Sequence, residues 1–79
     1  MTTLPADEDY AKGLLTIFSA HAVRPGQSLR ESEVSREFRL RNLGRDFDYH
    51  AAVAYSETQG WLRRESDWLR LTRGGFAEM

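Results

Sequence analysis

The chain has 79 residues, a net charge of -1 and no cysteine, and 41% of its residues are hydrophobic. This composition is typical of one small globular domain and not of a disordered chain. The lack of cysteine excludes disulfides, thiolate metal sites and cysteine catalysis. We expect a cytoplasmic protein without cofactor, metal or membrane span, in which residues 1–6 form a mobile tail and residues 7–79 the domain.

The first predicted helix begins with the acidic residues 7–9, which suit the positive end of a helix dipole. It should run to about Val23, because apolar residues recur at spacings of three, four and seven. Pro25-Gly26 then predicts a turn.

Two interpretations remain open for the next segment. Ser28 and Glu31 fit a capping box, which would start a helix at Leu29. Alternatively, residues 27–30 form a short strand and Ser32 caps the helix, and this is the interpretation we favour. In both cases the second helix should end near residue 40.

A third helix is predicted from Asp46, a good N-cap residue, to Gln59, because no proline interrupts it and Gly60 follows. One face carries Phe47, Ala51, Ala54 and Thr58, and the opposite face carries Tyr49, Ala52, Val53 and Ser56. Both faces are largely apolar, so the pattern does not indicate which one is buried. Either the helix is covered on more than one side, or its outer face is unusually apolar.

Two strand-like runs, residues 61–65 and 68–72, flank Ser66-Asp67 and predict a β-hairpin. Pairing Arg64 with Leu69, and Leu62 with Leu71, turns the leucines toward the helices. The opposite face would then carry Trp61, Arg63, Glu65, Trp68 and Arg70. A four-residue turn fits as well as a two-residue turn. Thr72 can cap a last helical turn.

The predicted order is helix, short strand, helix, turn, helix, hairpin and terminal helical turn. Gly60-Trp61-Leu62 enters the hairpin, and Leu71-Thr72-Arg73-Gly74-Gly75 leaves it. This pattern resembles the winged helix-turn-helix family of transcription regulators over nearly the whole chain. The resemblance implies a mostly helical α+β domain of three helices with a C-terminal hairpin, the wing.

The resemblance also implies DNA binding, with the third helix in the major groove and the wing on phosphates. The groove face would carry Asp48, Tyr49, Ala52, Val53 and Ser56, and the implied DNA-binding residues are Arg41, Arg45, Tyr49, Ser56, Arg63, Arg64 and Arg70. This groove face departs from the family, because it lacks Arg, Lys, Asn and Gln, the usual base readers, until Gln59.

The alternative function is a protein-interaction module that binds no nucleic acid, in which Tyr49, Val53 and Trp68 make the contact. The arginines would then form a solvated surface offset by carboxylates. For Tyr49 and Val53 a place in the core is equally open, and Trp61 fits the core better than Trp68 does. A homodimer is compatible with either function.

An enzyme is not expected. His21 and His50 lie on different predicted helices, and a metal site needs three or four ligands. No nucleophile and base are placed to orient each other, and a chain this small has little room for a catalytic pocket.

Overall fold

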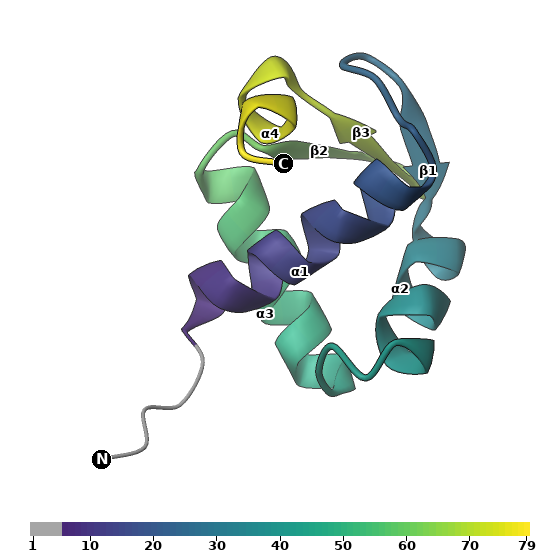
Figure 1. Ribbon diagram of the computed structural model, residues 1–79, viewed down its shortest axis with the longest axis vertical. Helices are drawn as coiled ribbons and strands as arrows, with labels where there is room; N and C mark the ends of the chain where they lie inside the picture. Colours follow the sequence, from purple (N-terminus) through teal and green to yellow (C-terminus); the bar gives the residue numbers. More distant parts are fainter. Residues whose placement is uncertain (1–5) are drawn as a thin grey trace.

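The computed structural model describes residues 6–79, so the predicted tail lies outside the described residues except for Ala6, which is the N-cap of the first helix. The elements are α1 Asp7–Ala20, β1 Ser28–Arg30, α2 Glu31–Leu40, α3 Asp46–Thr58, β2 Leu62–Glu65, β3 Trp68–Leu71 and α4 Arg73–Ala77 (Figure 1). The fold is mostly helical with a small three-stranded antiparallel sheet, which confirms the predicted α+β class.

The strand order in the sheet is β1–β3–β2. Leu62 pairs with Leu71 and Arg64 with Leu69, as predicted, while β1 places Leu29 opposite Leu69. Because side chains alternate along a strand, all four leucines lie on the inner face of the sheet. This face packs against the helices and closes one side of the core.

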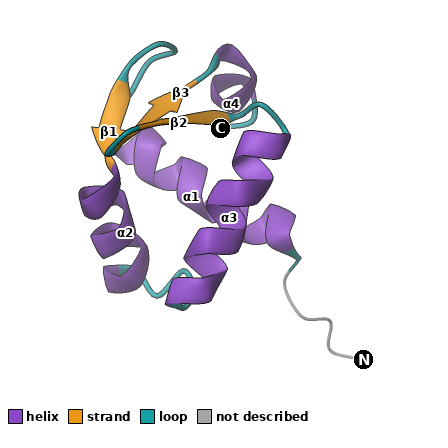
Figure 2. Ribbon diagram, turned by 180° about the vertical axis from the view of Figure 1, so that it is seen from behind, coloured by secondary structure: helices purple, strands orange, loops and turns teal. Residues whose placement is uncertain are grey.

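The helices build the other side of the core, with α1 lying against α3 as its main partner (Figure 2). The buried apolar cluster consists of Ala11, Leu14, Leu15, Ile17, Phe18, Val23, Val34, Phe38, Tyr49, Ala52, Val53, Trp61, Leu62, Leu69 and Leu71. Trp61 is therefore a core residue, which confirms that it fits the core better than Trp68 does; it does not lie on the outer side of the hairpin, where the strand alternation placed it.

Two helices end earlier than predicted. The last residue of α1 lies three positions before Val23, because Ala22 has a left-handed backbone with φ of 54°, which a right-handed helix does not continue. The end of α3 is Thr58, one residue before the predicted Gln59, and Gly60 follows with φ of 75°.

Two helix starts also differ from the prediction. Glu31 begins α2 directly after β1, so Ser32 lies inside the helix and does not cap it. Arg45, and not Asp46, occupies the N-cap position of α3. The side chain of Asp48 accepts a hydrogen bond from the Arg45 backbone N–H at 2.9 Å, which satisfies one of the free donors at this end.

The orientation of α3 is opposite to the one that the resemblance implied. Tyr49, Val53 and Ser56 are buried against the rest of the fold, and the Ser56 side chain is 0% exposed. Phe47, in contrast, is 69% exposed and marks the outward face of the helix. Since both faces are apolar, packing against α1 and the sheet decides the orientation, and the periodicity of α3 alone does not.

Thr72 caps α4 as predicted, because its Oγ1 accepts a hydrogen bond from the Gly75 N–H at 3.0 Å. The carbonyl oxygens of Gly60 and Trp61 lie 2.5 and 2.9 Å from the same hydroxyl, within reach of its single proton. Gly75 is buried so close to Trp61 that a Cβ at this position would overlap the Trp61 carbonyl. This contact fixes α4 to the base of the hairpin.

Candidate functional site

The side of the sheet that faces away from the helices gathers arginines from all three strands. Arg63 of β2 lies opposite Arg70 of β3, which in turn lies opposite Ser28 of β1. Toward the hairpin turn, Arg30 of β1 lies opposite Trp68 of β3. Paired residues of an antiparallel ladder point to the same side of the sheet. We call this surface the outer sheet face; it comprises Ser28, Arg30, Arg63, Glu65, Trp68 and Arg70.

The arginines of the outer sheet face differ in their partners. The Arg30 guanidinium lies 4.7 Å from the centre of the Trp68 ring, a cation–π contact. Arg70 Nη2 lies 2.8 Å from Glu65 Oε1, but both side chains are more than 40% exposed, so this ion pair contributes little to stability. Among residues 6–79, no carboxylate lies within 4.0 Å of the Arg63 guanidinium. The face therefore carries cationic groups that are open to an external anion.

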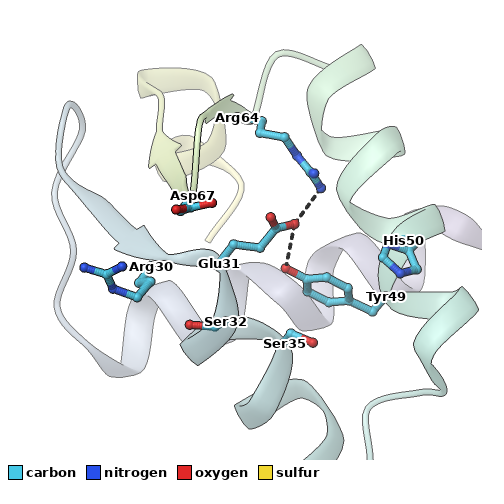
Figure 3. A pocket seen from close by; sticks show the side chains of 8 residues that line it. All are labelled: Arg30, Glu31, Ser32, Ser35, Tyr49, His50, Arg64 and Asp67. Carbon is cyan, nitrogen blue, oxygen red and sulfur yellow. Dashed lines mark hydrogen bonds and ion pairs between the residues drawn. The ribbon is translucent and has the colours of Figure 1, made fainter.

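Arg64 points to the other side of the sheet and joins a separate cluster (Figure 3). Its Nη2 lies 2.5 Å from Glu31 Oε2 and its Nε lies 3.9 Å from Glu57 Oε1. The Tyr49 hydroxyl donates a hydrogen bond to the same Glu31 oxygen at 3.4 Å. Burial, followed by the charge of Glu31, raises the pKa of Tyr49, and Arg64 opposes this shift. Arg64 is thus held between carboxylates of its own chain and is not directed outward.

This cluster lines a hollow of about 470 Å³ between the start of α2, the first half of α3 and the hairpin. The lining residues are Arg30, Glu31, Ser32, Ser35, Tyr49, His50, Arg64 and Asp67 (Figure 3). Arg30 borders both this hollow and the outer sheet face. Together with Arg64 it offsets the two carboxylates, Glu31 and Asp67, so the lining has no net formal charge. Within residues 6–79, no group of three acidic or histidine side chains is placed to hold a metal ion.

The residues that the resemblance implied as DNA contacts do not form one surface in the structure. Tyr49 and Ser56 belong to the core and cannot reach DNA. Arg41, the C-cap of α2, is paired through Nη2 with Glu37 Oε1 at 3.0 Å. Arg45 is exposed at the N-cap of α3, away from the sheet.

Of the implied contacts, Arg63 and Arg70 share a surface, and the structure adds Arg30 to them. Sequence reasoning missed Arg30 because its place depends on the pairing of β1, a strand of three residues. The signal was present in the alternation around Leu29: a leucine that faces the core from a strand turns its neighbour Arg30 outward.

Of the residues predicted for a protein contact, some are buried and one is exposed. Tyr49 and Val53 are buried, so the predicted contact through them is wrong. Trp68 is 42% exposed and remains available. Four further large apolar side chains among the described residues are open to solvent: Leu40 at 71%, Phe47 at 69%, Phe76 at 47% and Met79 at 42%.

Comparison of the sequence with protein-family models gave no match, and comparisons of the chain with curated proteins and with solved structures gave none either. Between residues 6 and 79, no helix combines the length and the apolarity needed to cross a membrane. The chemistry of the surfaces described above is therefore the basis for a functional assignment.

Proposed function

We propose that this protein is a winged helix-turn-helix domain that binds DNA through the outer sheet face. The element order supports the winged-helix assignment, because the resemblance of the sequence rests on the same order. In this assignment β2 and β3 form the wing, and α3 takes the place of the recognition helix. We place the function in the cytoplasm, since the domain has no cysteine.

The observation that carries the proposal is the set of three arginines, Arg30, Arg63 and Arg70, on one exposed face of the sheet. Like charges directly opposite each other destabilise an antiparallel pair, and Arg63 and Arg70 are such a pair. A phosphate between them would replace this repulsion with charge-assisted hydrogen bonds. Arginine suits this role because its planar guanidinium binds phosphate with two parallel hydrogen bonds.

The outward face of α3 does not support base reading. It carries the carboxylates Asp46 and Glu57 beside Phe47 and Ala54, and no arginine or lysine. Side chains that read base edges are mainly Arg, Lys, Asn and Gln. We therefore expect contacts to the DNA backbone, with little preference for sequence.

A salt titration with duplex DNA tests the proposal. Three phosphate contacts predict a slope of about -2.7 in log K against log salt, so raising salt from about 50 to 200 mM should weaken binding about 40-fold. The double variant Arg63→Ala/Arg70→Ala leaves one contact, and the same salt step should weaken its binding only about 3.5-fold.

The matched control is Lys12→Ala/Arg73→Ala. Both residues are exposed, on α1 and α4, and their removal changes the net charge by the same amount. The control should keep the wild-type slope. Absence of binding at low salt would refute the proposal, and so would an equal loss of slope in both double variants.

A second candidate function is a protein-interaction module. Exposed Leu40 and Phe47 favour it, because they flank the turn between α2 and α3 and are the two most exposed large apolar side chains. The partner would present an apolar contact surface, against which Leu40 and Phe47 bury their side chains. Binding to such a partner would be lost in Phe47→Ser and retained in Arg63→Ala/Arg70→Ala, whereas DNA binding would show the reverse.

A further inference from the structure

We propose that the outer sheet face binds single-stranded DNA in preference to duplex, with an unpaired base stacked on the Arg30–Trp68 pair. The inference rests on the proposed DNA binding and names the form of DNA that this face recognises. The inference starts from Trp68, an exposed side chain that has no role in binding the phosphates of a duplex.

Trp68 is placed as a stacking surface. It is a large apolar side chain that is 42% exposed, while the other tryptophan, Trp61, is 7% exposed and belongs to the core. Arg30 lies across one side of the Trp68 ring, with 4.7 Å between the guanidinium carbon and the ring centre. Unpaired bases stack both on aromatic rings and on the planes of guanidinium groups. The pair therefore offers an incoming base the exposed guanidinium of Arg30 and the exposed part of the indole.

Stacking selects single strands because the bases of a duplex are already stacked and paired with each other. A single strand presents its bases at no such cost, and every base has an aromatic face. The outward face of α3 adds no duplex contact that would offset this difference, since it lacks basic side chains and base readers.

The phosphate contacts lie next to the stacking surface on the same strand. Trp68 and Arg70 are two residues apart on β3, about 6.7 Å along the strand, and Arg63 lies beside Arg70 on β2. A strand that runs along β3 can thus place a base on Trp68 and its phosphates at Arg70 and Arg63. This combination of a cationic track with an aromatic platform is the usual means of binding single strands.

The test compares a 15-nucleotide oligothymidine with a 15-base-pair duplex of mixed sequence, each titrated at about 50 mM salt. We expect the oligothymidine to bind more tightly and to quench tryptophan fluorescence. Trp68→Ala should weaken oligothymidine binding about tenfold, as expected for the loss of one stacked base, and change duplex binding less than about twofold. Trp68→Phe keeps an aromatic ring and should retain most of the affinity. Thermal unfolding of both variants checks that the exposed side chain is not needed for the fold.

The outcomes separate this inference from the function on which it rests. If the duplex binds as tightly as the oligothymidine, or if Trp68→Ala weakens both equally, the stacking proposal is overturned while DNA binding through the arginines stands. If neither DNA binds, both proposals fail. Loss of oligothymidine binding in Trp68→Ala with recovery in Trp68→Phe supports the stacking surface.

Discussion

Ser56 is a polar residue in an apolar core, and replacing it with alanine should stabilise the protein. Its side chain is 0% exposed, and its Oγ has no hydrogen-bond partner among residues 6–79. A buried hydroxyl without a partner costs about 1–3 kcal/mol. Alanine also has a higher helix propensity than serine, by about 0.5 kcal/mol. The void left by one oxygen atom reduces the gain by about 0.3 kcal/mol.

The sum predicts that Ser56→Ala raises the free energy of unfolding by about 2 kcal/mol. In a domain of this size such a change raises Tm by about 10 °C. Thermal and urea unfolding followed by circular dichroism measure both quantities. The control is Ser19→Ala on the exposed side of α1, which changes helix propensity without any burial.

The difference between the two variants isolates the cost of the buried hydroxyl. Equal stabilisation by Ser56→Ala and Ser19→Ala, or destabilisation by Ser56→Ala, would refute the reasoning. A hydrogen bond in solution from the Ser56 hydroxyl to a main-chain carbonyl of the preceding turn, the usual acceptor for a serine in a helix, would explain either result.

Three further predictions concern the fold. Val53→Glu should prevent folding because it buries a charge in the core. Phe47→Glu lies on the exposed face of α3 and should change the free energy of unfolding by no more than about 0.5 kcal/mol. Equal effects of the two variants in urea unfolding would show that α3 is oriented differently. Gly75→Ala should lower the free energy of unfolding by about 2 kcal/mol, because the added Cβ overlaps the Trp61 carbonyl. Gly74 has room for a Cβ, so Gly74→Ala should leave the free energy of unfolding unchanged or raise it. Equal midpoints of thermal unfolding for the two variants would contradict this prediction. Burial raises the pKa of the Tyr49 hydroxyl. Above about pH 10 the unfolded chain therefore loses the tyrosine proton before the folded protein does, and the free energy of unfolding should fall. Urea midpoints measured from about pH 9 to 11 should fall less in Tyr49→Phe than in the wild type.

The hairpin could be predicted in detail because its leucines alternate with charged residues. The register that pairs Arg64 with Leu69 puts Leu62, Leu69 and Leu71 on the same side, and the structure has this register. The same register already placed Arg64 on the side of Leu69. The resemblance to winged helices assigned Arg64 to phosphate instead, and here the alternation was the better guide, since Glu31 holds this arginine.

The orientation of α3 could not be predicted in the same way. Phe47 is the largest apolar side chain of the helix and would normally mark the core, but it is exposed. Ser56 is polar and would normally mark the surface, but it is buried. The contacts that decide the orientation come mainly from α1 and also from the sheet, and they depend on tertiary packing that a helical period does not record.

The two edges of the sheet also determine how the protein behaves at high concentration. The edge strand β1 has only three residues and leads directly into α2, which leaves little backbone to pair with another chain. The other edge, β2, carries the consecutive charged residues Arg63, Arg64 and Glu65. Short and charged edges oppose the strand addition that starts amyloid-like aggregation. Residues 6–79 therefore offer a second chain no long apolar strand to extend, and titrations at the concentrations that NMR requires should proceed without fibril formation.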